Sequence, residues 1–152
     1  MKKKNEIIKF QFEEDKITEA VIRLLIREGV TEHLKEVQFC EKYLDLYSYN
    51  IDKHVYIAVE SKINSVSRAF QQALRYKHLA NYVYVALLRN NTNKRARDLS
   101  KLTGVGLILV RRDSKNRFFA EFNLPAVESI YHDIKIAEYT WNLNKPGYVY
   151  AQ

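Results

Sequence analysis

The amino-acid sequence predicts an α/β fold built on one β-sheet flanked by helices, and two observations lead to this prediction. Segments with strand character alternate with segments of helical period, in the order helix, three strands, helix, strand, helix, strand, strand. No internal repeat, low-complexity tract or linker divides the sequence. We therefore expect one domain over residues 1–152, with its core at about 15–122 and a C-terminal extension at 123–152.

The first half of the chain predicts a helix, three strands and a second helix. From Asp15 to Glu28, apolar residues recur at helical spacing, and Gly29 follows as a stop signal. The strand-like segments are residues 37–40, 43–48 and 55–60. Asn64 and Ser65 are suited to cap the second helix, whose apolar stripe extends to Tyr76.

The second half predicts three more strands and a short helix between them. In chain order we expect a buried strand at 82–88, a basic helix at 94–102, a buried strand at 105–110, a hairpin turn at 113–116 and a strand at 117–122. Beyond Pro125 a further helix is expected to about Glu138, and the segment from Tyr139 to Gln152 shows no clear period.

Bulk composition restricts the class of protein. A net charge of +7 and a pI near 9.4 favour a polyanionic partner such as nucleic acid, although an anionic membrane surface or an acidic protein would also suit. Cys40 is the single cysteine, which excludes an internal disulfide and a cysteine-based zinc site and indicates a reducing setting. Because there is no signal sequence and no apolar run near the ~18 residues of a membrane span, we expect a cytoplasmic protein without a membrane partner.

One predicted strand ends in an acid and a base. Side chains alternate along it, so Glu60 and Lys62 leave the same face two positions apart. Such charges are costly to bury without partners, which favours a site at this strand end, with a surface ion pair as the alternative. Asp45 lies in the preceding strand, and a hairpin would bring the two acids together. Two converging carboxylates repel, and Mg²⁺ or Mn²⁺ would relieve that repulsion.

These residues resemble the signature of the PD-(D/E)XK nuclease superfamily, which includes restriction enzymes, archaeal Holliday-junction resolvases and many DNA-repair nucleases. The likeness rests on Asp45, on Glu60-Ser61-Lys62 at the end of the next strand, and on Gln72 and Tyr76, which are similar to a Gln-x-x-x-Tyr signature in the following helix. It covers about residues 15–88, or 15–122 with the later strands. Leu44 stands where the family usually has proline. The resemblance implies a restriction endonuclease-like core with a single mixed sheet and the order αβββαβ.

The resemblance also implies a role for each matched residue. Asp45 and Glu60 would bind the metal together with the backbone carbonyl of Ser61, and Lys62 would position or polarise the attacking water. A cation held by two acids lowers the pKa of bound water and neutralises charge on the phosphate, and a neighbouring lysine stabilises the same charge. Glu19 resembles the extra acid that many branches place on the first helix. The alternative role for Glu19 is an ion pair with Arg23, four residues later on the same helix.

Other side chains are candidates for holding the nucleic acid. Arg68, Gln72 and Tyr76 are spaced four apart and form one stripe on the second helix, although Tyr76 equally suits the core. The further basic residues expected to neutralise DNA phosphates, with an ordinary charged surface as the alternative, are Lys94, Arg95, Arg97, Arg111 and Arg112.

The sequence thus predicts a Mg²⁺-dependent endonuclease that hydrolyses DNA phosphodiester bonds, with branched or otherwise structured DNA as one substrate class. The alternatives are a catalytically inactive DNA-binding or regulatory module of the same fold, and a small α/β protein-interaction domain. A chain of this size has no room for a separate recognition domain, which favours a homodimer. Its pairing surface is expected between Leu124 and Tyr150, around Trp141.

Overall fold

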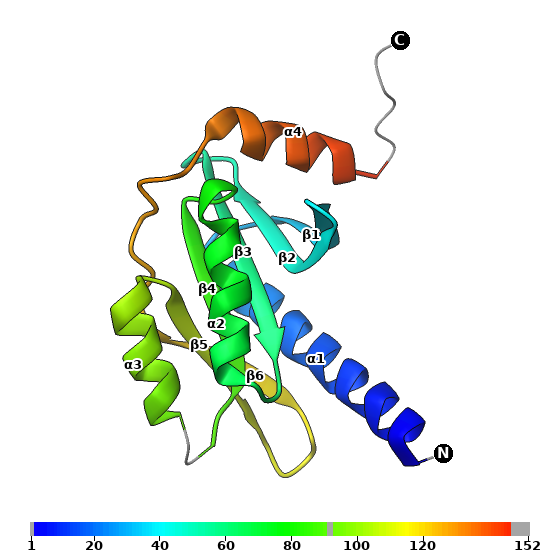
Figure 1. The fold of residues 1–152 in the computed structure, drawn as a ribbon. Coiled ribbons are helices and arrows are strands. Elements are labelled where there is room, and N and C mark those ends of the chain that lie inside the picture. Colours follow the sequence, from blue (N-terminus) through cyan, green and yellow to red (C-terminus); the bar gives the residue numbers. More distant parts are fainter. Residues whose placement is uncertain (1, 91–92, 147–152) are drawn as a thin grey trace.

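The computed structural model describes residues 2–90 and 93–146, with side chains from residue 13 onward, and its described elements form a six-stranded sheet with helices on both faces (Figure 1). The elements in chain order are α1 (Lys2–Arg27), β1 (Glu32–Phe39), β2 (Lys42–Asn50), β3 (Val55–Lys62), α2 (Val66–Leu74), the 3-10 helix η1 (Arg75–His78), β4 (Tyr82–Leu88), α3 (Lys94–Thr103), β5 (Gly106–Arg112), β6 (Phe118–Leu124) and α4 (Ile134–Asn144). The α/β class, the single mixed sheet and the order αβββαβ are confirmed.

The strands follow one another in sequence order across the sheet. β1, β2 and β3 form an antiparallel meander, β3, β4 and β5 are parallel, and β6 pairs with β5 in the antiparallel sense. α2 and α3 are the crossovers between the parallel strands. The carboxyl ends of β3, β4 and β5 therefore lie at one edge, where α2 and α3 also begin (Figure 1).

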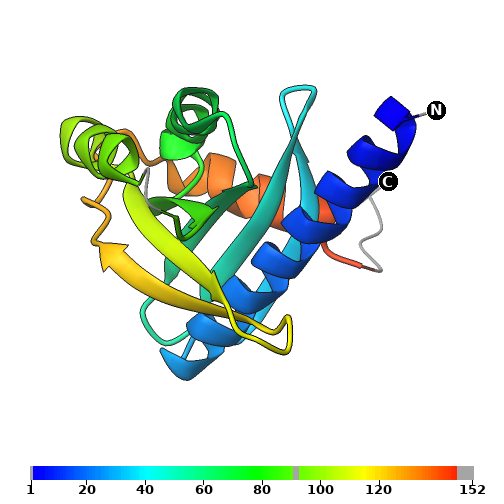
Figure 2. The same ribbon diagram turned by 90° about the horizontal axis from the view of Figure 1, so that it is seen from below.

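Each face of the sheet carries its own hydrophobic core, because strand side chains alternate between the two faces. α1 covers one face, where Ile17, Val21 and Leu25 pack with residues such as Val59 and Ile108. α2, η1, α3 and α4 cover the other (Figure 2). The buried residues that represent this second core are Tyr47, Phe70, Leu79, Leu107 and Trp141.

The predicted strands and the first three helices are confirmed, with shifts at their ends. The first helix begins well before Asp15, at Lys2. Ser65 occupies the position before α2, but its side chain makes no cap hydrogen bond and its φ is 60°, so the prediction that it caps the helix is wrong. Its hydroxyl instead donates to the Asn64 side chain.

The helix expected directly after Pro125 is also wrong. Residues 125–133 are non-helical, and α4 begins at Ile134, where the Asp133 carboxylate accepts hydrogen bonds from the backbone N–H groups of Lys135 and Ile136. Trp141, predicted to lie on a pairing surface, is buried against Tyr47 and Tyr56. It therefore belongs to the chain's own core. Tyr150 lies outside the described residues.

Within the described ranges, every helix falls short of the combination of length and apolarity that a membrane crossing requires.

Candidate functional site

Strand β2 separates from β3 at Asp45. The β2–β3 ladder runs from the Asn50–Val55 pair to the Leu46–Val59 pair and ends there, although both strands continue. Beyond that point the Asp45 Oδ2 atom accepts a hydrogen bond from the Ser61 N–H at 2.8 Å. The carboxylate thus replaces the backbone partner that β2 would otherwise supply.

An irregularity in the β1–β2 hairpin accompanies this separation. Leu44 and Leu46 are two residues apart and should share a face, yet they are buried in opposite cores. Glu36, which lies opposite Asp45 in the register, has a φ of 52°. The register of the hairpin is unchanged here, so the irregularity lies in the local backbone conformation, and the Asp45 side chain is directed toward the end of β3.

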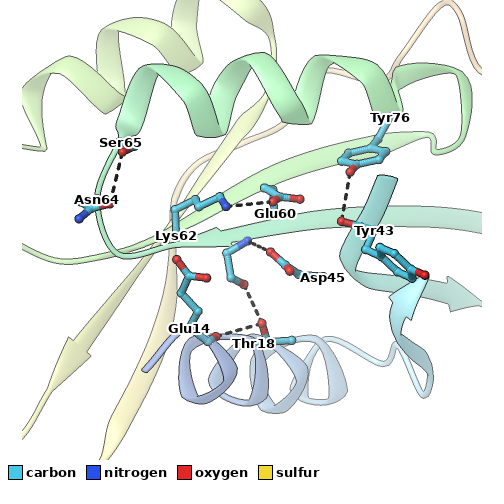
Figure 3. Close-up of polar contacts among 10 residues, drawn as sticks. Glu14, Thr18, Tyr43, Asp45, Glu60, Lys62, Asn64, Ser65 and Tyr76 are labelled. Carbon is cyan, nitrogen blue, oxygen red and sulfur yellow. Dashed lines mark hydrogen bonds and ion pairs between the residues drawn. The ribbon is translucent and has the colours of Figure 1, made fainter. Parts of the chain in front are cut away.

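Glu60 and Lys62 leave the face of β3 that α2 covers, as predicted from the alternation. The Lys62 Nζ atom lies 3.8 Å from Glu60 Oε1 (Figure 3). The Glu60 side chain is only 5% exposed, and Lys62 is 24% exposed, so the site reaches the surface along the lysine. Ser61 points to the other face, where it accepts a hydrogen bond from Thr18 at 2.9 Å.

Burial raises the pKa values of both acids. For Glu60, burial is the main cause of the raised pKa and the nearby Asp45 carboxylate adds to it, against the opposing effect of Lys62. Burial likewise raises the pKa of Asp45, to about 6, although the Ser61 N–H lowers it. Near neutral pH the raised pKa of Glu60 favours its protonated form, and additional positive charge beside the acids would favour ionisation of both.

A buried carboxyl oxygen at this site, Glu60 Oε2, makes none of the hydrogen bonds counted in the structure. Among the described residues, the buried side-chain oxygens and nitrogens without a hydrogen bond are Glu60 Oε2, Gln72 Oε1 and His132 Nε2. Leaving a buried polar atom unsatisfied costs about 1–3 kcal/mol. Of these, Glu60 Oε2 belongs to the site, and the Glu60 carboxyl also lies within hydrogen-bonding reach of the Asp45 carboxyl, so a proton or a bound cation between the two acids would satisfy it.

The backbone carbonyl of Ser61 is placed to be a third oxygen donor. In a strand, the N–H and C=O of one residue point to the same side. Since the Ser61 N–H meets Asp45, its carbonyl also faces the region that β2 has left. Two carboxylates and a carbonyl are hard oxygen ligands that suit Mg²⁺, which is held by one or two carboxylates with waters and phosphate completing its shell.

The oxygens present therefore fit a divalent cation, but few protein side chains would hold it. Across residues 2–90 and 93–146, no group of three or more His, Cys, Asp or Glu side chains is arranged as a metal site.

The predicted stripe of Arg68, Gln72 and Tyr76 runs from the surface into the site. Arg68 is exposed, Gln72 is half-buried, and Tyr76, on η1, is buried. The Tyr76 hydroxyl donates to the Tyr43 carbonyl at 3.5 Å, and burial followed by the Glu60 and Asp45 charges raises its pKa. Tyr76 is therefore a core aromatic whose hydroxyl lies near the acids, and its role in binding nucleic acid stays a prediction.

The structure does not bring Glu19 to the site. Its carboxylate is more than half exposed and pairs with Lys35 on β1 at 3.2 Å, not with Arg23. One residue in a helix turns the side chain by about 100°, and on α1 it is Thr18 that faces the end of β3.

Glu14, one turn before Thr18, is the α1 acid near the site, and the sequence analysis missed it. It is half-buried, accepts a hydrogen bond from the Ile63 N–H, and has a pKa raised by burial and lowered by Lys62. Figure 3 shows its carboxylate directed toward Lys62. The four-residue spacing from Thr18 was the available signal, but the predicted helix began one residue too late to include it.

The predicted phosphate-binding residues fall on two faces. Lys94, Arg95 and Arg97 lie in the first turn of α3, at the same edge as Lys62, and Arg95 donates to Ser67 of α2 at 2.6 Å. Arg111 ends β5 at this edge. Arg112 does not join them, because it points to the α1 face, where it pairs with Glu13 at 3.2 Å and lies over Phe118.

Fold and site together define the class of protein. It is an α/β protein in which two strands of a mixed sheet separate, and two buried carboxyl groups and a partly exposed lysine meet where they do so. No family model and no curated protein matches the chain.

Solved structures do resemble it. One is a protein of unknown function from Silicibacter pomeroyi, 16% identical, which aligns over 82% of this chain and 80% of its own with a TM-score of 0.58. Another is SfsA from Pyrococcus furiosus in complex with Ca²⁺, 14% identical over 68% of this chain and 58% of its own, with a TM-score of 0.44. The first shows the fold alone.

Proposed function

We propose that this chain is a Mg²⁺- or Mn²⁺-dependent nuclease that hydrolyses DNA phosphodiester bonds, as the resemblance to PD-(D/E)XK nucleases implies. The observation that supports it most is the convergence of Asp45, Glu60 and Lys62 at the point where β2 leaves β3. These groups come from two strands and converge beside Lys62, whose side chain is 24% exposed, whereas the Glu60 side chain is 5% exposed.

The ligands of the cation would be the Asp45 and Glu60 carboxylates with the Ser61 carbonyl. A cation bound there lowers the pKa of its water and offsets negative charge that builds on the phosphate. The structure supports this donor set through the unpartnered Glu60 Oε2 and through the raised pKa of both acids.

The protein's own groups then have distinct tasks. Hydrolysis adds a water oxygen to phosphorus and breaks the bond to one ester oxygen, while negative charge increases on the phosphoryl oxygens. The Lys62 ammonium, partly exposed beside Glu60, is placed to stabilise that charge and to orient the water. Glu60 pairs with the lysine, and the negative charge of Glu14 lies near it on the side of α1.

Cleavage assays with matched variants test the proposal. Supercoiled, linear and junction DNA are incubated with Mg²⁺, Mn²⁺ or a chelator, using the parent protein and Asp45→Asn, Glu60→Gln and Lys62→Met. Glu28→Gln and Lys53→Met are the controls, since both side chains are exposed and Lys53 precedes the far end of β3. We expect metal-dependent cutting that falls by roughly 10²-fold or more in the three site variants and is unchanged in the controls.

Other outcomes decide between the alternatives. Cutting that survives Glu60→Gln contradicts the proposed centre. Salt-sensitive DNA binding without cutting by the parent supports an inactive DNA-binding module. Neither binding nor cutting supports a protein-interaction domain.

A homodimer acting in the cytoplasm belongs to the same proposal. The exposed apolar side chains suited to pairing are Val127, Ile130, Tyr131, Ile134 and Tyr139. Two copies would present two centres to two strands of DNA, and a single mass of about 36 kDa in sedimentation, twice the 18.0 kDa of one chain, would support this assembly.

A further inference from the structure

A second polar hollow lies at the same edge of the sheet, beside β4, β5 and β6. Its volume is about 470 Å³, and its lining residues are Arg89, Asn90, Asn93, Arg97, Leu109, Arg111, Glu121, Phe122 and Asn123. Three arginines and one glutamate leave it with two net positive charges. None of the residues proposed to hold the metal lines it.

Strand pairing places the arginines next to one another. Val110 pairs with Leu88 and its carbonyl accepts from the Arg89 N–H at 2.7 Å, so Arg89 and Arg111 are neighbours across the β4–β5 ladder. Both lie two residues beyond Leu87 and Leu109, which are buried in the α2 and α3 core, so both side chains leave that face. Arg97 approaches from the first turns of α3, which cover the same face.

The guanidinium groups in this hollow are poorly neutralised. The side chains of Arg89 and Arg97 have no hydrogen-bond or ion-pair partner among the residues that the structure describes. Arg111 has one exposed contact, to Glu121 at 3.4 Å. Like charges gathered around one cavity repel, and an anion that binds several of them would relieve the repulsion.

We propose that this hollow binds a phosphate group of the nucleic-acid strand held at Lys62, other than the phosphate being cut. A guanidinium matches phosphate through paired N–H donors, so three of them around one cavity suit a phosphate better than a single carboxylate. That the bound phosphate belongs to a nucleic-acid strand rests on the proposed function. The phosphate itself has two sources, an internal diester or a terminal monoester, which carries about twice the charge.

The position of the hollow suits a continuous strand. Lys62 pairs with Leu87 of β4, and Arg89 follows two residues later at the same edge. With neighbouring strands about 4.8 Å apart, β5 is about 10 Å from β3, a span of roughly three nucleotides at about 3.4 Å each. A strand bound at Lys62 therefore reaches the arginines without leaving this edge.

DNA binding measured without catalysis tests the proposal. Fluorescence anisotropy is recorded in chelator, with labelled single-stranded and duplex oligonucleotides that carry either a 5′-phosphate or a 5′-hydroxyl. The variants are Arg89→Ala with Arg97→Ala, the same pair changed to lysine, and a control with Lys53→Ala and Lys135→Ala. The control removes the same charge from exposed positions away from this edge.

We expect the alanine pair to weaken binding at least tenfold and to reduce the slope of log K against log salt by about 0.9, the contribution of one lost phosphate contact. The lysine pair should retain most of the affinity, which separates charge from folding. A loss seen only with 5′-phosphorylated DNA assigns the hollow to a strand end, and a loss with both assigns it to an internal phosphate.

Equal effects of the alanine pair and the control pair would overturn the proposal. Because no cutting occurs in chelator, this result is independent of the nuclease assay. If Glu60→Gln left metal-dependent cutting intact, the proposed centre would fail while the phosphate site remained.

Discussion

Replacing Glu60 by glutamine should stabilise the protein in the absence of divalent cations. Glutamine has nearly the shape of the protonated acid and carries no charge. Glu60 is almost fully buried, and its pKa is raised to about 9, mainly by burial and then by Asp45. Without a cation, the folded protein must therefore hold this carboxyl in its protonated form at neutral pH.

The size of the effect follows from the proton that folding takes up. The ordinary pKa of the group is 4.5, and each pH unit above that value costs the folded state about 1.4 kcal/mol. At pH 7 the cost is about 3 kcal/mol. For a chain of this length 1 kcal/mol shifts Tm by about 2–4 °C, so Glu60→Gln should raise Tm by roughly 6–12 °C.

The pH dependence has a definite sign. A raised pKa in the folded state means that the parent keeps the full stability contribution of Glu60 below about pH 4.5 and loses it as the pH rises through about 9. The difference in Tm between variant and parent should therefore be near zero at pH 4.5 and should grow steadily up to pH 9.

Thermal unfolding of both proteins, followed by circular dichroism in chelator between pH 4.5 and 9, measures this difference. Adding Mn²⁺ or Mg²⁺ should then stabilise the parent increasingly at higher pH and leave Glu60→Gln unaffected. A variant that is no more stable than the parent across this range would refute the argument from buried charge.

Three further predictions concern the surroundings of the site. Glu14→Gln should slow metal-dependent cutting about tenfold, equivalent to about 1.4 kcal/mol, because it removes a charge beside Lys62. The control Glu19→Gln should change the rate less than twofold. Equal rates for the two variants would contradict the assignment of Glu14 to the site. Ser61→Ala should lower the free energy of unfolding by about 1 kcal/mol, because the buried hydrogen bond from Thr18 is lost. The affinity for Mn²⁺, measured by calorimetry, should stay unchanged, since the backbone carbonyl remains. A large loss of affinity would argue against a backbone ligand. Gly106→Ala should lower the free energy of unfolding, measured by urea titration, by about 1–3 kcal/mol, because a Cβ there would lie 2.4 Å from the Tyr84 ring and 2.7 Å from the Ala126 nitrogen. An unchanged urea midpoint would show that both neighbours can move.

The convergence of Asp45, Glu60 and Lys62 could be predicted because it depends on local rules. Alternation along one strand places Glu60 and Lys62 together, and a short hairpin between two strands brings an acid from each to one end. The separation of β2 from β3 was not predicted, because the irregular backbone at Glu36, opposite Asp45, leaves no clear pattern in the sequence.

Other site residues were missed or misplaced for identifiable reasons. Glu14 lay just outside the predicted first helix, so its face was never compared with that of Thr18. Arg89 stands between a strand and a polar loop, where periodicity assigns no direction. α4 was placed too early because its buried positions, Ala137, Thr140 and Trp141, are few and its remaining residues face solvent.

The sequence alone determined the kinds of elements, their order and the charged residues that end β3, since each of these depends on periodicity within a few residues. Tertiary structure decided which acid of α1 faces the site, which of two adjacent arginines on β5 belongs to the basic hollow, and where β2 opens. Those outcomes depend on register and on packing between segments far apart in the chain, and no short window of sequence contains both partners.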